Sequence, residues 1–357
     1  MEIRRITAKQ INPGPRLPGA RLPKVISIVV TVLVIAVGIT SGGAREAAET
    51  QPTFRTAIDI VRVPVTVVDR DGNLYTDLDA SAFKVFEDGQ EREVVNFASS
   101  QESLTMVLLL EHSRLTQYLV GEILRPAAVF TTQIMERGDY AAIVAFDNRP
   151  HVLVDFTENR QQLLDAIDRM SRSPAGFSES NLFSAVRFAL AGGVLENVEY
   201  KGLREVEGRT GLLVVASGLD TLSNITYDDI RRTAANSGVP VFTMGIGELA
   251  YIRAEPYLSG PQRLTFLQAQ NQLRTLAQES GGRFYSVRFP AAVDRVLESI
   301  ATMLRFQYTL GYRPAEQGKE KREIQVRVDV DGDGLADNDR LDLSHRRYFH
   351  TEKRGNP

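Results

Sequence analysis

Apolar runs alternate with segments of helical spacing from residue 104 to residue 305, and this alternation constrains the fold more than any other feature. The runs LTMVLLL at 104–110 and GLLVVAS at 211–217 carry no charge, which is typical of strands buried on both faces of a parallel sheet. After the first run, Leu119 and Ile123 begin a series of apolar residues three to four positions apart, as in an amphipathic helix. Strands that alternate with helices predict an α/β fold with a doubly wound, mostly parallel sheet.

The remaining segments of this region follow the same rhythm. We expect a helix over 119–134 that Pro126 kinks, and an antiparallel hairpin formed by 139–147 and 151–156. REVEGR at 204–209 is predicted to be a solvated loop. Right-handed crossovers would place helices on both faces of the sheet and bring the loops that follow the strands to one rim, where such folds bind ligands. The other expected elements are helices at 159–170, 181–196, 226–237, 264–280 and 291–305 and strands at 239–247 and 283–287.

Strand-like segments flank this region on both sides. Residues 57–101 are predicted to form a small β module, in which valines alternate with other residues from 61 to 67 and Pro64 indicates a sheet edge. Residues 311–350 are predicted to form a C-terminal β appendage of three strands that packs with this module, and residues 351–357 a tail. The α/β domain is expected to occupy residues 102–310.

The first residues have the pattern of a membrane-targeting segment. Residues 1–24 form a basic leader, and residues 25–40 contain no charged side chain. Residues 25–44 are therefore predicted to be a transmembrane anchor or a cleaved signal peptide, followed by a linker at 45–56. We favour the anchor, because the leader is long for a signal peptide and its positive charge keeps it cytoplasmic. The protein is then a single-pass membrane protein with its C-terminal bulk exported, or a secreted one if residues 1–44 are removed.

Composition excludes several classes of protein. The 42 Lys and Arg residues nearly balance the 45 Asp and Glu residues, whereas dedicated nucleic-acid binders carry a strong basic excess. The sequence contains no cysteine, so disulfides, thiol nucleophiles and Cys-ligated zinc are excluded. It also contains no G-x-S-x-G, H-E-x-x-H or P-loop motif. We therefore predict a non-catalytic protein without a nucleic-acid partner.

Three separated segments carry a resemblance to a known family. EHSRL at 111–115 follows the first strand, a hairpin comes second, and VVASGLD at 214–220 covers the end of the fourth strand. This order resembles the von Willebrand factor A domain over roughly residues 102–310. The segments VRVPVTVVDRDGNLYTDLDASAFKVFEDGQEREVVNF before it and YTLGYRP after it resemble the bacterial VWFA-related family, of the type abundant in Acidobacteria.

The resemblance implies a metal-ion-dependent adhesion site at the rim of the sheet. In such sites a D-x-S-x-S motif, a threonine and an aspartate hold Mg²⁺, and an acidic group of the partner completes the octahedron. The matching positions are degenerate here, because only the first serine of the motif is retained. The resemblance thus implies a degenerate metal site on Glu111, Ser113 and Ser180, and a ligand-binding rim marked by Glu111, Ser113, Ser180, Ser217 and Asp220.

The substitutions at this rim weaken any Mg²⁺ site. Glu111 is one methylene longer than the aspartate it replaces, which displaces its carboxylate by ~1.5 Å from a metal that tolerates little variation in distance. Leu115 supplies no oxygen, and Ser217 removes a negative charge. Asp220 could replace that charge only through a water molecule. We expect Mg²⁺ to bind weakly or not at all. In the alternative interpretation, Glu111, Ser113 and Ser180 are polar loop residues that cap helices.

A second candidate cation site lies near the C-terminus. DVDGDGLADND places Asp329, Asp331, Asp333 and Asp337 at positions one, three, five and nine of a calcium-type loop. The twelfth position is Arg340, where a calcium loop has a bidentate glutamate. A solvated hairpin loop uses the same residue types, so both a calcium site and a plain loop remain open.

The sequence therefore predicts an exported, non-catalytic protein that binds a protein or a cell-surface ligand through the rim of its A-type domain. The alternative is a structural or assembly component of the cell envelope, and a hydrolase is a third hypothesis. A polar rim with no exposed aromatic anchors favours the structural role over specific ligand capture. No cofactor is assigned beyond a Mg²⁺ or Ca²⁺ ion, and the membrane is contacted only through the N-terminal segment.

Overall fold

The computed structural model describes residues 60–99, 103–206, 208–247, 259–287, 290–315 and 319–351. The predicted leader, membrane segment and linker lie outside the described residues, as do the first residues of the predicted β module and all of the predicted tail except Thr351. Among the helices that are described, none is both long enough and apolar enough to cross a membrane.

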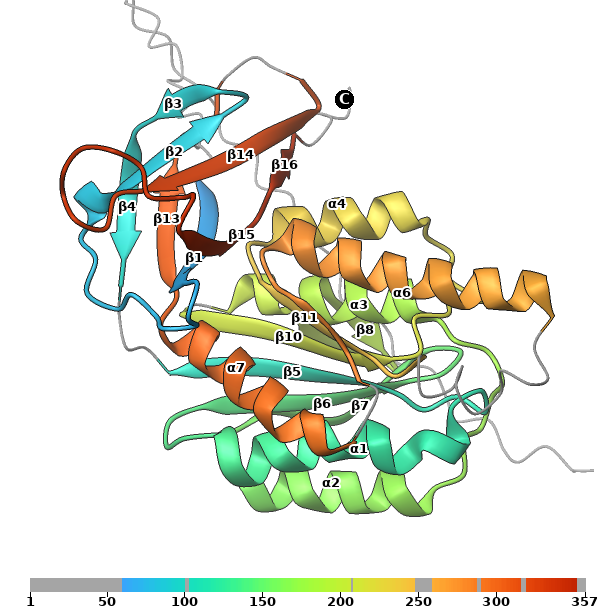
Figure 1. Ribbon diagram of the computed structural model, residues 1–357. Coiled ribbons are helices and arrows are strands. Elements are labelled where there is room, and N and C mark those ends of the chain that lie inside the picture. Colours follow the sequence, from blue (N-terminus) through green and yellow to red (C-terminus); the bar gives the residue numbers. More distant parts are fainter. Residues whose placement is uncertain are drawn as a thin grey trace, which may run out of the picture. The chain divides into compact units, whose positions relative to one another are not determined.

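A six-stranded sheet forms the centre of the α/β domain (Figure 1). Its strand order is β12-β11-β10-β5-β6-β7, with parallel pairing throughout except between β6 and β7, which are antiparallel. The prediction of a mostly parallel sheet that contains one antiparallel hairpin is confirmed. The strands are β5 (Leu104–Glu111), β6 (Tyr140–Phe146), β7 (Pro150–Thr157), β10 (Arg209–Ala216), β11 (Val241–Gly245) and β12 (Phe284–Ser286).

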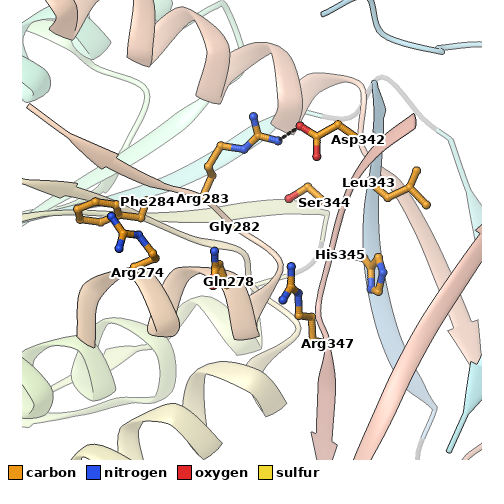
Figure 2. Close-up of a pocket in the computed structure, with 10 residues that line it drawn as sticks. All are labelled: Arg274, Gln278, Gly282, Arg283, Phe284, Asp342, Leu343, Ser344, His345 and Arg347. Carbon is orange, nitrogen blue, oxygen red and sulfur yellow. Dashed lines mark hydrogen bonds and ion pairs between the residues drawn. The ribbon is translucent and has the colours of Figure 1, made fainter. Parts of the chain in front are cut away.

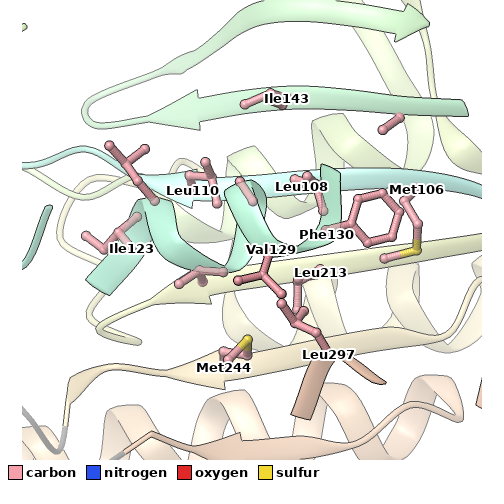
Figure 3. Close-up of a cluster of buried hydrophobic side chains, with 14 of the residues drawn as sticks. Met106, Leu108, Leu110, Ile123, Val129, Phe130, Ile143, Leu213, Met244 and Leu297 are labelled. Carbon is pink, nitrogen blue, oxygen red and sulfur yellow. The ribbon is translucent and has the colours of Figure 1, made fainter. Parts of the chain in front are cut away.

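Helices cover both faces of this sheet, because its central strands bury alternate side chains on opposite sides (Figure 1). Leu108 and Leu110 of β5 pack in the cluster with α1 (Val120–Val129), α2 (Arg160–Arg172) and α7 (Val293–Arg305), part of which is shown in Figure 3. Val107 and Leu109 pack in the cluster on the other face. That face is covered by α3 (Leu182–Ala191), α4 (Tyr227–Ser237) and α6 (Gly260–Ser280).

Local sequence signals fix where several helices begin and end. The side chain of Asn159 accepts hydrogen bonds from the first backbone N–H groups of α2. Thr226 and Asp229 form a reciprocal capping box at the start of α4. Gly281 ends α6 in the left-handed conformation that glycine adopts without steric cost. In α1, which contains the expected Pro126, the regular helix stops at Val129 and a five-residue π-helical segment follows.

The flanking segments form one unit with two four-stranded sheets. The sheet orders are β15-β1-β13-β4 and β16-β14-β2-β3, so strands from before and after the α/β domain pair with one another. Their facing side chains form a separate apolar core that includes Val63, Val85, Leu310 and Val326. The strands are β1 (Val61–Asp69), β2 (Phe83–Glu87), β3 (Gln90–Arg92), β4 (Val94–Ala98), β13 (Tyr308–Tyr312), β14 (Lys321–Val328), β15 (Leu341–His345) and β16 (Tyr348–His350).

The prediction that Pro64 marks an edge strand is wrong. Pro64 is buried in β1, which lies between β15 and β13. The sheet tolerates this proline because β15 pairs only with Val65–Asp69. On the β15 side of Pro64 no neighbouring strand accepts a backbone hydrogen bond, so the missing N–H of proline costs nothing there. The predicted last strand is also divided, since β15 ends at His345 and β16 begins at Tyr348.

Two further predictions between α3 and β10 are wrong. The helix expected at 181–196 stops at Ala191, and a hairpin of β8 (Gly192–Leu195) and β9 (Val198–Lys201) follows. Gly192 adopts a φ of 74°, which ends the helix, and Glu196 and Asn197 both have positive φ in the hairpin turn. Arg209, expected in a solvated loop, is buried as the first residue of β10 and pairs with Leu104.

Candidate functional site

Three loops meet at the carboxyl edge of the central sheet. The loop after β5 is joined to the loop before α3, because the N–H of Arg114 donates to the carbonyl of Phe177 at 2.8 Å. The loop after β10 is joined to the same segment by hydrogen bonds between Thr221 and Ser180. The N–H of Thr221 donates to the carbonyl of Ser180 at 2.8 Å, and the N–H of Ser180 donates to Oγ1 of Thr221 at 2.9 Å. The structure thus places the loops that carry the predicted rim residues side by side.

Glu111 is the buried acid of this rim. Its Oε1 accepts a hydrogen bond from Oγ of Ser113 at 2.8 Å, and its Oε2 accepts one from the backbone N–H of Ser217 at 2.7 Å. All three residues are essentially inaccessible to solvent. Burial raises the pKa of the Glu111 carboxyl, and the hydrogen bonds from Ser217 and Ser113 oppose part of that rise. Both carboxyl oxygens are therefore engaged: Oε2 holds β5 to the loop after β10, and Oε1 holds the loop that follows β5.

Ser180 and Asp220 lie on the neighbouring part of the rim, around the start of α3. Oδ1 of Asp220 accepts a hydrogen bond from the N–H of Phe183 at 3.1 Å, so this carboxylate caps α3 from a different loop. Ser223, which the sequence did not single out, also donates to Asp220. Ser180 is buried, and among the described residues its Oγ has no hydrogen-bond partner. Asp220 thus acts as a helix cap in this structure.

The oxygen donors at the rim do not suit a Mg²⁺ site. An octahedral Mg²⁺ ion needs carboxylate oxygens that are free to coordinate it. Here both oxygens of Glu111 accept hydrogen bonds, Leu115 stands at the last position of the motif, and Asp220 is committed to α3. Among the predicted rim residues, all of which the structure describes, the buried oxygen without a hydrogen-bond partner is Oγ of Ser180, a neutral ligand. The arrangement fits an internally hydrogen-bonded polar core better than a cation site.

The aspartates of the C-terminal loop gather as their spacing predicts. Among the described residues, the single cluster of at least three acidic or histidine side chains close enough to hold a metal ion is formed by Asp329, Asp331 and Asp333. Hydrogen bonds from the N–H groups of Gly334 and Gly332 lower the pKa of Asp329. The fourth expected ligand, Asp337, is not part of this cluster.

Arg340 neutralises part of this acidic loop. Its guanidinium contacts Asp331 at 2.6 Å, and its Nε donates to Asp337 at 2.7 Å. Hydrogen bonds with these two carboxylates raise the pKa of Arg340. The residue at the twelfth position therefore supplies a positive charge where a calcium loop would supply a ligand.

Exposed apolar side chains surround the rim. They come from the loop after β5, the loop before α3, the loop after β10 and the first turns of α6, and each is between 38% and 61% exposed. α6 contacts this edge near its middle, where Nε2 of Gln270 donates to the carbonyl of Ser217 at 2.9 Å, and Leu264 and Leu267 lie about one to two turns before that contact. Periodicity did not distinguish these residues from core positions. They are Leu115, Tyr118, Phe177, Leu222, Leu264 and Leu267.

The sequence of the α/β domain matches a known family. The von Willebrand factor type A domain matches residues 117–299, which is more than half of the chain. The chain belongs to this family. The six-stranded sheet described above, with its single antiparallel pair, is thus the sheet of a von Willebrand factor type A domain, and the three loops form its rim. No curated protein is similar enough to this chain to match it.

Several solved structures are similar to this chain at low sequence identity. Proximal thread matrix protein 1 from the mussel byssus has 11% identity and a TM-score of 0.40, over 60% of this chain and 49% of that protein. An aerotolerance-related membrane protein from Bacteroides fragilis has 13% identity and a TM-score of 0.39, over 56% and 98%. The vWF domain of a type V pili tip protein from Porphyromonas gingivalis has 13% identity and a TM-score of 0.40, over 57% and 97%.

Proposed function

We propose that this chain is a non-catalytic binding protein that holds a protein partner on the rim of its von Willebrand factor type A domain without a metal ion. The observation that carries the proposal is the set of six exposed apolar side chains on the rim loops and the first turns of α6, beside a buried acid that is satisfied internally. Exposed apolar groups grouped on one edge are typical of interaction sites. They favour capture of a partner over the alternative role as a polar docking block of the envelope.

The chemistry of the rim supports binding without Mg²⁺. Coordination of Mg²⁺ needs carboxylate oxygens that are free of other partners, whereas both oxygens of the buried Glu111 already accept hydrogen bonds. Tyr118 and Phe177 instead offer rigid aromatic surface, which contributes strongly to protein interfaces at a low cost in conformational entropy. A partner with a complementary apolar patch fits this rim better than one that offers a single acidic group.

The experiment compares variants of the rim with variants of other exposed apolar positions. The chain would be used to capture proteins from envelope extracts of its own source, with either Mg²⁺ or a chelator present. We expect Leu264→Ser with Leu267→Ser to abolish capture of a defined partner, and Ile60→Ser with Leu335→Ser to leave it unchanged. Ile60 and Leu335 are 48% and 69% exposed and belong to the β unit, where Ile60 precedes β1 and Leu335 follows β14, which makes them matched controls. Equal capture by both pairs, or capture that requires Mg²⁺, would contradict the proposal.

We further propose that the chain is exported and held in a membrane by residues 25–44. The support is the pattern of a basic leader followed by an uncharged apolar run. Protease treatment of intact cells should digest an epitope placed after residue 351 and spare one placed before residue 25. N-terminal sequencing of the mature protein would then distinguish an anchor, which keeps Met1, from a signal peptide cleaved near Ala44.

A further inference from the structure

A groove lies between two edge strands at the end of the sheet opposite the rim. β12 is the edge strand of the central sheet, and β15 is the edge strand of the sheet that contains β1. The cavity between them has a volume of about 280 Å³, and the last turns of α6 form its third wall. Figure 2 shows the side chains that surround it.

Close backbone contacts fix the floor of this groove. A Cβ atom at Gly282 would lie 2.1 Å from the carbonyl oxygen of Val241, and one at Gly281 would lie 2.7 Å from the backbone nitrogen of Arg346. Only glycine permits these approaches. Oγ of Ser344 also donates to the carbonyl of Gly281 at 3.0 Å. The two edge strands are therefore held at a fixed separation, and the groove exists before any ligand arrives.

Positive charge dominates the lining. Three arginines from three separate segments face a single carboxylate, that of Asp342. Arg283 pairs with Asp342 at 2.8 Å, and the guanidinium of Arg274 lies 4.8 Å from the ring centre of Phe284 (Figure 2). Arg347 is exposed and takes part in none of the ion pairs found among the described residues. Two guanidinium groups thus lack a counter-charge within the groove.

The neutral groups of the lining complete a set of hydrogen-bond donors. The amide of Gln278 and the hydroxyl of Ser344 lie between the arginines. His345 adds no charge, because burial lowers the pKa of its imidazole. The planar guanidinium fork matches the spacing of oxygens in phosphate and carboxylate groups, and a contact through two such forks favours an anion with two charges.

We propose that this groove is a binding site for a phosphate-type dianion. Arg274 and Arg347, which form no ion pair among the described residues, supply the charge; Arg274 is held by a hydrogen bond from its Nη1 to Oδ1 of Asn271 at 3.2 Å. Arg283, already oriented by Asp342, supplies a further N–H donor. The size of the cavity suits a single phosphate group with a small substituent. The site is independent of the rim, because it lies at the C-terminal end of α6 while the rim includes the N-terminal end of that helix.

Calorimetric titration of the full-length chain in a non-ionic detergent tests the proposal. The probes are inorganic phosphate, glucose 6-phosphate and acetate, the last as a single-charge control. We expect both phosphates to bind and acetate to bind at least about tenfold more weakly. Tighter binding of glucose 6-phosphate than of inorganic phosphate would assign the site to phosphate monoesters, and the reverse order would assign it to free phosphate.

The variants Arg347→Gln and Arg274→Gln each remove one charge from an exposed side chain, and each should weaken phosphate binding by about tenfold. Arg172→Gln is the control, since Arg172 is an exposed arginine paired with Asp168 on another surface. Unchanged melting temperatures would establish that all three variants fold. An absence of phosphate binding to the wild-type chain, or equal weakening by Arg172→Gln, would overturn the proposal.

Discussion

Replacing Glu111 tests whether this residue is a structural acceptor or a metal ligand. Glu111→Ala would leave the buried backbone N–H of Ser217 without its acceptor, and the hydroxyl of Ser113 would also lose its partner. An orphaned buried donor costs about 1–3 kcal/mol, and the cavity left by the side chain adds to this cost, so we expect the free energy of unfolding to fall by at least about 1–3 kcal/mol. Glu111→Gln keeps a carbonyl oxygen for Ser217 and lets the Ser113 hydroxyl turn toward Thr116, which lies 3.4 Å away. Its cost should stay below about 1 kcal/mol.

The difference in stability between Glu111→Gln and the wild type should depend on pH in a defined direction. Because burial raises the pKa of Glu111, the folded protein binds the proton more tightly than the unfolded chain does. The wild type therefore loses stability as the pH rises from the unfolded pKa of 4.5 through the raised folded value. Glutamine has no such loss, so the stability of Glu111→Gln relative to the wild type should increase over that range and then stay level.

Urea unfolding followed by circular dichroism, from about pH 4 to pH 8, measures both effects. Mg²⁺ and a chelator should leave the wild-type midpoint unchanged. The reasoning is refuted if Glu111→Gln is as unstable as Glu111→Ala, or if Mg²⁺ raises the midpoint of the wild type alone.

Two arginines of the β unit give further predictions. Arg322 and Glu87 form a buried ion pair at 2.7 Å. Arg322→Met should therefore lower the free energy of unfolding, measured by calorimetric melting, by about 3–5 kcal/mol. A loss smaller than about 1 kcal/mol would contradict this prediction. Arg340→Glu removes the positive charge that neutralises Asp331 and Asp337 and places a carboxylate at the twelfth position of the loop. Calcium affinity measured by calorimetry should rise at least about tenfold, and an unchanged affinity would argue for a plain loop.

The central sheet could be predicted because its middle strands β5, β10 and β11 are buried on both faces and are therefore mostly apolar. Where local sequence competes with packing, prediction failed. The apolar spacing before Gly192 continues into Val194 and Leu195. Periodicity alone therefore predicted a helix that runs on through residues that form a hairpin. The two glycines at 192 and 193 were the available signal. The charge of Arg209 suggested an exposed side chain. Arg209 is buried instead, because it is the first residue of β10 and pairs with Leu104 of β5.

The candidate site was predictable in position but not in chemistry. Glu111 and Ser217 are 106 residues apart, and only the folded sheet brings the carboxyl of one to the backbone N–H of the other. A sequence pattern cannot show that both carboxyl oxygens are engaged. It also cannot separate Leu264, which is exposed, from Leu273 of the same helix, which is buried, since both fit an amphipathic pattern.

The α/β domain is inserted between strands of the β unit, and this arrangement determines how mechanical tension would travel. The chain leaves the unit after β4 and returns at β13, and these two strands are paired, with Ala98 opposite Thr309. A pull on the two ends of the described chain acts first on β1, which pairs with β15 through Val65–Asp69, and on β16, which pairs with β14. The backbone of His350 in β16 also exchanges hydrogen bonds with the side chain of Asn236 in α4, so this pull reaches the inserted domain through the last turn of α4 and not through its rim.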